Sequence, residues 1–183
     1  FQGLVLGLSG LSSFASIPFW SFISLKLGKR NTWQFSMTLL LFAFMLFYLY
    51  QINTLTELIF IVCLIGLASG AGGVLFWSML PDTIEYGEWI SGIRSESSLY
   101  GFMTFAQKSS IAVAALLLGI LLTFIDFAPN EVQTTETLNG LKNIMSIIPA
   151  LGIAFSILLM YFYPISSKYH KELLLKIEAR KNG

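Results

Sequence analysis

Long stretches without a charged side chain constrain this sequence more than any other feature. Residues 1–25, 31–56, 58–81 and 143–167 contain no Lys, Arg, Asp or Glu. Each stretch exceeds the roughly 20 apolar residues with which a helix crosses about 30 Å of hydrocarbon. Only 11% of all residues are charged, whereas a soluble domain carries about 25%. The sequence therefore predicts an all-α membrane protein.

The apolar stretches and the polar segments between them predict a bundle of about five transmembrane helices within residues 1–165. Polar turns separate the expected helices, and the two longest polar segments are expected to be loops over residues 81–96 and 126–142. A basic cytoplasmic tail is expected over residues 166–183. The expected helices cover residues 4–27, 32–50, 58–80, 97–125 and 143–163.

Small residues are concentrated in the middle of the third expected helix. Gly66 and Gly70 lie four residues apart, as do Ser69 and Gly73, so each pair shares a helix face. Small residues at this spacing allow two helix backbones to approach closely. We therefore expect this helix to pack tightly against a neighbour.

The distribution of basic residues predicts the orientation of the chain. With five crossings, nearly all cationic side chains fall on one side, and the other side has only Lys142. Cytoplasmic loops carry the excess of Lys and Arg, so the N-terminus is expected outside and the C-terminus in the cytoplasm. The tail is expected to be either an amphipathic surface helix or a frayed end. The cations on the cytoplasmic side are Lys26, Lys29, Arg30, Arg94, Lys168, Lys171, Lys176, Arg180 and Lys181.

Lys108 is the most informative single residue. It follows the start of the fourth expected helix by 11 residues, which places it roughly 16 Å along the helix, near the bilayer midplane. A lysine there costs about 2.5–3.5 kcal/mol and should face a bundle interior. Thr104 shares its face, Tyr100 continues that face towards the cytoplasm, and Gln107 flanks it. This polar stripe predicts a substrate or ion pathway, or alternatively a structural ion pair with an acid outside this chain.

Three carboxylates, Asp82, Glu85 and Glu88, would share a helix face if the third helix continued past Pro81, because their spacings are three and three. Such a set could bind a metal ion. Cationic side chains are expected at the same membrane edge, which favours salt bridges that hold one conformation closed. These expected partners are Lys29, Arg30 and Arg94.

No constellation in the sequence indicates an enzyme or a nucleic-acid-binding protein. There is no Ser–His–Asp arrangement, and His170 is expected to be a solvated residue of the tail. The glycines between Gly66 and Gly73 lie within a membrane span and are not followed by the Lys of a phosphate-binding loop. A net charge of +1 without a basic, aromatic patch excludes the usual single-strand binding surface. We expect no cofactor and no protein-bound metal.

Three motifs together resemble the glycoside–pentoside–hexuronide:cation symporter family of the major facilitator superfamily. They are the segment 81–89 (PDTIEYGEW), the segment 94–96 (RSE) and the segment 105–108 (FAQK). One departure concerns the third helix. The family's melibiose permease has a cavity tryptophan where this chain has Gly73, and Trp77 lies one turn further on.

The resemblance implies twelve helices in two six-helix halves, with the five helices here as helices eight to twelve. It implies that Lys108 lies near the sugar and cation sites and that Thr104 lines the same cavity. It also implies that Asp82 and Glu85 belong to a cytoplasmic gate that pairs with the N-terminal half. The cation and the main part of the sugar would be bound by acids of that half. The remaining expected gate residues are Glu88, Arg94, Glu96, Lys29 and Arg30.

The function that follows from the resemblance is that of the C-terminal part of a secondary active transporter. It would couple uptake of a glycoside, pentoside or hexuronide to Na⁺ or H⁺ by alternating access. The expected partners are the lipid bilayer, the sugar and the missing N-terminal helices, in a bacterial inner membrane. Two alternatives remain: a facilitator-type carrier for a lipid or drug, and a membrane scaffold that does not transport.

Overall fold

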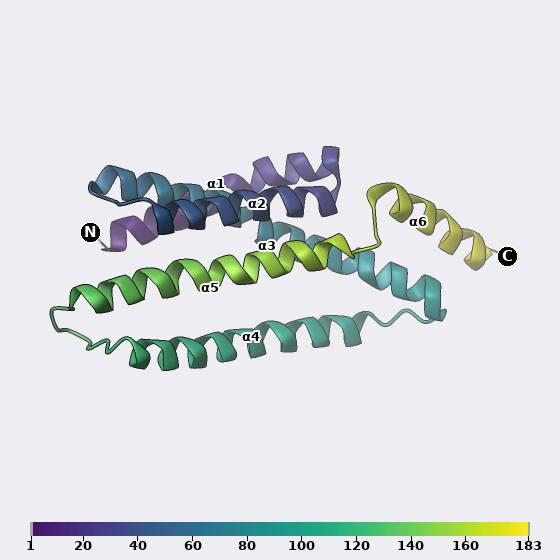
Figure 1. Ribbon diagram of the computed structural model, residues 1–183. Coiled ribbons are helices and arrows are strands. Elements are labelled where there is room, and N and C mark those ends of the chain that lie inside the picture. Colours follow the sequence, from purple (N-terminus) through teal and green to yellow (C-terminus); the bar gives the residue numbers. More distant parts are fainter. Residues whose placement is uncertain (1, 183) are drawn as a thin grey trace.

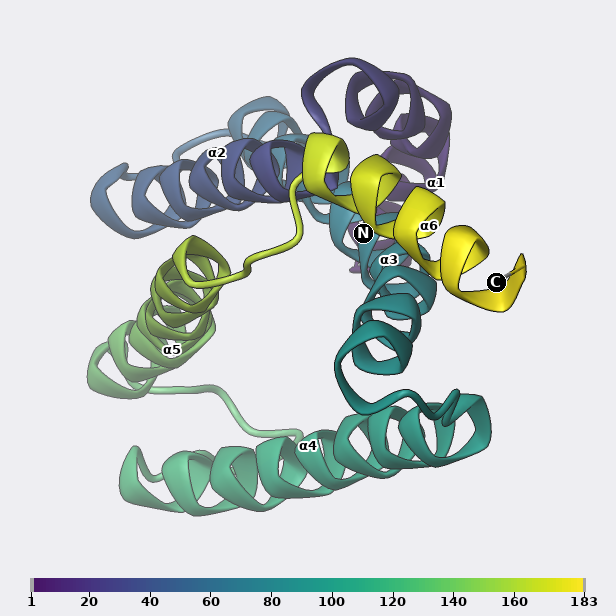
Figure 2. The ribbon, with the colours of Figure 1, turned by 90° about the vertical axis from the view of Figure 1, so that its right-hand side faces the viewer.

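The computed structural model describes residues 2–182, and within them the chain forms six helices (Figure 1). All the long elements run roughly parallel or antiparallel to one another, and the shorter last helix lies across one end (Figure 2). The all-α prediction is confirmed. The helices are α1 (Gln2–Leu27), α2 (Lys29–Leu49), α3 (Leu55–Ser91), α4 (Glu96–Phe124), α5 (Thr135–Tyr161) and α6 (Ser167–Asn182).

Five of these helices, α1 to α5, are long and apolar enough to cross a membrane. Large apolar side chains cover their outer faces, and Leu25, Phe14 and Phe105 are among the most exposed of them. In water such a surface would be unfavourable, because apolar area in contact with water carries a free-energy cost. Against hydrocarbon it carries none, so the surface itself fits a lipid environment.

The third helix is longer than predicted. The prediction ended it near Leu80, but α3 continues through Pro81 to Ser91. Proline lacks the backbone donor and crowds the preceding turn, but it can kink a helix without ending it. The actual end is Gly92, whose left-handed backbone (φ 76°) and N–H bond to the Glu88 carbonyl close the helix. The expected loop over residues 81–96 is therefore mostly helical.

The fifth helix also begins earlier than predicted, at Thr135 instead of residue 143. Thr134 caps it, because its hydroxyl accepts a hydrogen bond of 3.1 Å from the Thr137 backbone N–H. Glu136 lies in the first turn, where an acid interacts favourably with the helix dipole. These polar residues form two helical turns that the apolar pattern could not indicate.

The tail is a helix and not a frayed end, but its apolar face lies against protein and not on the membrane surface where the prediction placed it. Residues Ser167–Asn182 form α6, which packs against α3 and crosses its end in Figure 2. Leu173 and Ile177 are 1% and 7% exposed, so the apolar face of the tail is buried against protein. The Tyr169 ring also meets the Tyr86 ring of α3 edge-on, with centroids 6.2 Å apart.

The tight packing expected of the small residues is found between α1 and α3. A methyl group added at Gly66 or Gly70 would collide with backbone carbonyls of α1, so only glycine allows this approach. Trp20 of α1 is fully buried in the same interface and donates a 2.7 Å hydrogen bond to the Leu67 carbonyl. Gly73 does not take part, because nothing lies within 4 Å of its missing side chain.

The helices α1, α2, α3 and α5 form the packed part of the bundle, while α4 lies to one side. Among the described residues, the main contact of α4 is with α3, and it is much weaker than the contacts of α3 with α1 and α2. The helix stands apart from α1 and α2 in Figure 2. None of the residues that the structure describes in α4 is buried. The chain therefore leaves most of the α4 surface uncovered.

Candidate functional site

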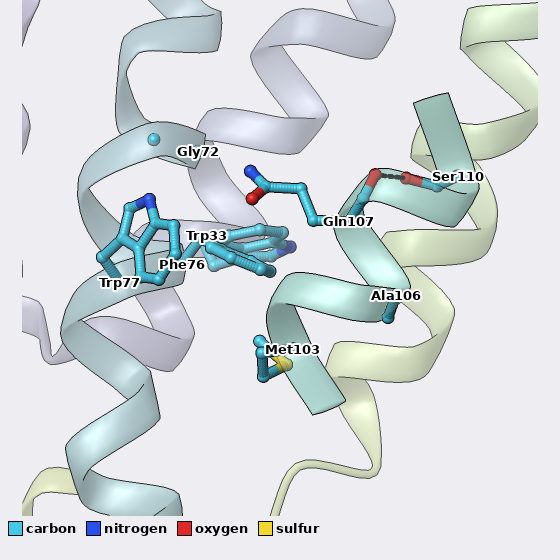
Figure 3. Close-up of a pocket in the computed structure, with 9 residues that line it drawn as sticks. Trp33, Gly72, Phe76, Trp77, Met103, Ala106, Gln107 and Ser110 are labelled. Carbon is cyan, nitrogen blue, oxygen red and sulfur yellow. Dashed lines mark hydrogen bonds between the residues drawn. The ribbon is translucent and has the colours of Figure 1, made fainter. Parts of the chain in front are cut away.

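A pocket of about 430 Å³ lies between α3 and α4, with one aromatic ring contributed by α2 (Figure 3). The predicted site residues Gly73, Trp77 and Gln107 all line it. In Figure 3 the Gln107 side chain extends from α4 towards α3. Sequence reasoning missed the remaining lining residues, most of which are apolar and formed no motif with the predicted ones. They are Trp33, Gly72, Phe76, Met103, Ala106 and Ser110.

Lys108 does not line this pocket. Successive residues of an α-helix are rotated by about 100°, so Lys108 points away from the side on which Ala106 and Gln107 meet α3. It is exposed and, within the described residues, makes no hydrogen bond or ion pair. The expectation that Lys108 faces the interior of this bundle is therefore not met by the part of the chain that the structure describes, because α4 lies at its edge.

Thr104 and Tyr100, two further members of the predicted stripe, lie towards the uncovered part of α4, whereas Gln107 lines the pocket beside α3. The Thr104 hydroxyl donates a 2.8 Å hydrogen bond to the Tyr100 carbonyl, one turn earlier in the same helix. Tyr100 itself borders a shallow polar depression near the start of α4, together with Arg94 and Glu96. The stripe is thus a continuous surface of α4, open on its outer side, and its role remains a prediction.

A second candidate site is the charged cluster at the end of α3. Lys29, at the start of α2, donates hydrogen bonds of 2.7 and 2.8 Å to the two carboxylate oxygens of Asp82. It also donates a 2.7 Å bond to the Ser78 carbonyl, in the turn before Pro81 where proline loosens helical hydrogen bonding. Asp82 is only 6% exposed, so this ion pair is largely shielded from water.

His170 of α6 joins the same cluster, and the expectation that it is a solvated surface residue is wrong. Its Nε2 atom lies 2.5 Å from a carboxylate oxygen of Glu85 and 3.6 Å from the Asp82 carboxylate. Helical spacing placed the two acids on one face, but only the fold brings the tail back to them. The sequence contained no signal for this contact beyond the apolar spacing of the tail.

The remaining acids of the expected gate are joined by Arg94. Its guanidinium lies 2.9 Å from Glu88 and 2.7 Å from Glu96, which links the end of α3 to the start of α4. The hydrogen bonds with Glu96 and then Glu88 raise the pKa of Arg94, so it stays charged at any physiological pH. Arg30 instead donates a 2.7 Å bond to the Tyr161 carbonyl and caps the end of α5.

Asp82, Glu85 and His170 also have the spacing of a metal site, since their donor atoms all lie within 4.8 Å of one another. However, the Lys29 ammonium already contacts both oxygens of Asp82. A divalent ion bound there would be repelled by this cation at short range. We therefore assign the cluster to a network of ion pairs.

Five helices that are long and apolar enough to cross a membrane place this chain among the polytopic membrane proteins. Transporters are one class of such proteins. A family model described as MFS/sugar transport protein matches residues 2–167. The chain belongs to this family, as the motifs at residues 81–96 and 105–108 indicated. Its members are membrane transporters, not enzymes.

Curated relatives carry transporter names. The chain is 36% identical over 156 residues to the "Putative sulfoquinovose importer" of Escherichia coli, with 85% of the chain and 33% of that protein covered. It is 38% identical over 121 residues to the "Putative 2,3-dihydroxypropane-1-sulfonate exporter" of Salmonella typhimurium, covering 66% and 26%. A "Glucuronide carrier protein homolog" of Escherichia coli is 26% identical over 181 residues, covering 99% and 40%. The chain thus spans about a third of the length of these relatives.

Proposed function

We propose that this chain is the C-terminal part of a secondary active transporter that takes up a sugar or sugar derivative together with Na⁺ or H⁺ by alternating access. The observation that carries the proposal is the match to a sugar-transport family over nearly the whole chain. The orientation proposed from the basic residues, with the C-terminus in the cytoplasm of a bacterial cell, places the charged cluster on the inner face.

The space between α3 and α4 supports the proposal that further helices complete the bundle. The pocket of Figure 3 adjoins a second apolar pocket of about 620 Å³ that shares Trp33, Phe76 and Met103 and extends to Tyr163. The Tyr163 hydroxyl is buried without a hydrogen-bond partner among the described residues, and burial raises its pKa to about 12. We propose that a preceding helix of the same protein fills this groove.

The uncovered face of α4 is the second part of the proposal. A lysine at mid-membrane depth is costly unless it meets water, an anion or a carboxylate. Lys108 contacts no carboxylate within the described residues. Three curated relatives are named for a sulfonated sugar, a sulfonate and a glucuronide, all of which carry an anionic group. We propose that Lys108 faces the central cavity and binds the anionic group of such a substrate, or the carboxylates that bind the cation.

The charged cluster is proposed as the cytoplasmic gate. It links α2, α3, α4 and α6 through side chains that lie beyond the apolar part of the bundle. In alternating access, contacts on one side of the membrane must form and break while the central site stays intact. Short ion pairs between separate helices are suited to this, because a displacement of a few ångströms breaks them.

The test uses the full-length protein in cells that lack their own uptake systems, with a panel of labelled substrates. The panel contains sulfoquinovose, a glucuronide and a neutral glycoside, each supplied with either a Na⁺ gradient or a pH gradient. We expect gradient-dependent accumulation of at least one of them. We also expect Lys108→Ala to lower uptake roughly 10- to 100-fold, since hydrogen bonds to charged groups contribute about 1.5–3 kcal/mol.

Lys142→Ala is the matched control, because Lys142 lies at the end of the bundle opposite the charged cluster and, among the described residues, bonds to the Tyr50 carbonyl alone. Its uptake should equal that of the unaltered protein. If no sugar accumulates but a lipid or drug is moved, the proposed substrate class is wrong. If charge reversal at Asp82 and Glu85 leaves a transporting protein unaffected, the proposed gate is wrong.

A further inference from the structure

The tail helix α6 is anchored to the rest of the protein by two different kinds of contact. The first kind is packing. The apolar side chains Leu173 and Ile177 are buried, and the Lys176 side chain lies over the Trp89 ring of α3, with its ammonium 5.8 Å from the ring centre. The second kind is ionic and consists of His170, which meets the carboxylates of α3 one turn before the apolar contact. Burial of apolar side chains does not depend on pH, but a histidine contact does.

His170 stands at the centre of a small group of charges. Glu85 and Asp82 of α3 lie 2.5 and 3.6 Å from its Nε2 atom, and Lys29 of α2 is bonded to Asp82. Among the described residues, these are the charged side chains of the neighbouring helices in this group. The titratable rings nearby are Tyr86, which meets Tyr169 of α6, and Tyr163, which interacts with Asp82. The Lys29 ammonium neutralises one of the two negative carboxylate charges, so one negative charge remains beside His170.

We propose that α6 is a latch on the cytoplasmic end of α3, held by the contact between His170 and Glu85 and released as the cytoplasmic pH rises. When His170 is protonated, it donates a charge-assisted hydrogen bond and balances the second carboxylate charge. When it is neutral, it donates only an ordinary hydrogen bond, and one negative charge stays unbalanced beside it. Charge-assisted hydrogen bonds are roughly twice as strong as neutral ones.

The direction of the pH dependence follows from this difference. Histidine is the side chain that changes charge between about pH 5 and pH 8. The protonated form is the one that stabilises the docked latch, so docking is strongest on the acid side of that range and weakens as the pH rises through it. Arg94 holds the other acids of the cluster at any pH in this range, so the latch is its pH-sensitive part.

The proposal deepens the proposed function, because Asp82 and Glu85 belong to the proposed gate, but docking of the tail can be measured without any transport. One spin label is placed at exposed Glu178 of α6 and one at exposed Leu49, at the far end of α2 (Figure 1). Cys63 and any other cysteine of the full-length protein are replaced. The distance distribution is then measured in nanodiscs at about pH 5.5 and about pH 8.5.

We expect a narrow distribution at the lower pH, and a broad, undocked component that increases about five-fold relative to the docked one at the higher pH. The Leu173→Ala background, in which the apolar contact is weaker, keeps both components measurable. His170→Gln keeps a neutral donor and should show the broad component equally at both values. His170→Arg keeps a permanent charge and should stay docked at both.

Glu172→Gln is the matched control for Glu85→Gln. Glu172 is exposed on the same helix as His170, and its replacement should leave the pH response intact, whereas Glu85→Gln should abolish it. A distribution that is the same at both pH values, in the unaltered protein and in the Leu173→Ala background, would overturn the proposal. So would a pH response that persists in His170→Gln. Loss of transport with a normal latch response would count against the proposed function alone.

Discussion

Replacing Lys29 with methionine leaves the Asp82 carboxylate without the ammonium that contacts both of its oxygens. Asp82 is 6% exposed, so water cannot fully replace the lost partner. Removing one partner of a buried ion pair costs about 3–5 kcal/mol, and removing one of an exposed pair costs about 0–1 kcal/mol. The Lys29 side chain is 34% exposed, so we expect an intermediate loss of about 2 kcal/mol.

A double-mutant cycle separates the ion pair from its surroundings. Asp82→Leu removes the buried charge, so Lys29→Met in that background should cost little, and the coupling between the two changes should be about 1.5–2 kcal/mol. The cycle is repeated with His170→Gln, because His170 lies 3.6 Å from the same carboxylate and would otherwise contribute to the result. A coupling that survives in this background belongs to Lys29 and Asp82.

The assay is reversible denaturation of the full-length protein in detergent, with thermal melting as a second measurement. Lys29→Met should lower the melting temperature by a few degrees. The matched control is Lys26→Met, since Lys26 is exposed and its one interaction within the described part of the chain is with the Phe22 ring. Its effect should stay within about 0.5 kcal/mol. A Lys29–Asp82 coupling below about 0.5 kcal/mol would show that the pair behaves as a surface ion pair and would refute this reasoning.

Three further changes test the packing. Gly70→Ala should destabilise the protein by about 1–3 kcal/mol in the same denaturation assay, because the added methyl meets an α1 carbonyl. Gly152→Ala, with open space around it, should be neutral or slightly stabilising. Trp20→Phe should cost about 1–2 kcal/mol, since it removes a buried hydrogen bond. Leu173→Ala should make the tail far more sensitive to limited trypsin digestion than Leu175→Ala, because the first side chain is buried and the second is 67% exposed.

The membrane-spanning parts of the fold were predictable because hydrocarbon imposes a length and a composition on each helix. The ends of α1, α2 and α4 lie within three residues of their predicted positions. The extensions of α3 and α5 were missed for one reason: outside the hydrocarbon a helix no longer needs apolar residues. There its ends depend on caps such as Thr134 and Gly92.

The candidate sites were predictable only in part. Spacing along one helix placed Asp82 and Glu85 on a common face, but the partner His170 comes from the tail, 85 residues beyond Glu85. Contacts of this kind depend on the three-dimensional fold, and no local pattern encodes them. For Gln107 and Lys108 the residues themselves were predicted, but their directions were not. The sequence indicated both, but which of them meets α3 depends on how α4 is rotated against it.

The length of α3 has a mechanical consequence. At 1.5 Å per residue its 37 residues span about 55 Å, and the part after Pro81 projects about 15 Å beyond the proline. That part can act as a lever arm with its pivot at Pro81, next to the contacts of Lys29 with Ser78 and Asp82. A change of about 10° at the pivot would move the far end by roughly 2.6 Å while hardly shifting Asp82. A small rearrangement near the membrane surface is thereby converted into a larger displacement at the tip of the helix, where Arg94 links α3 to the start of α4.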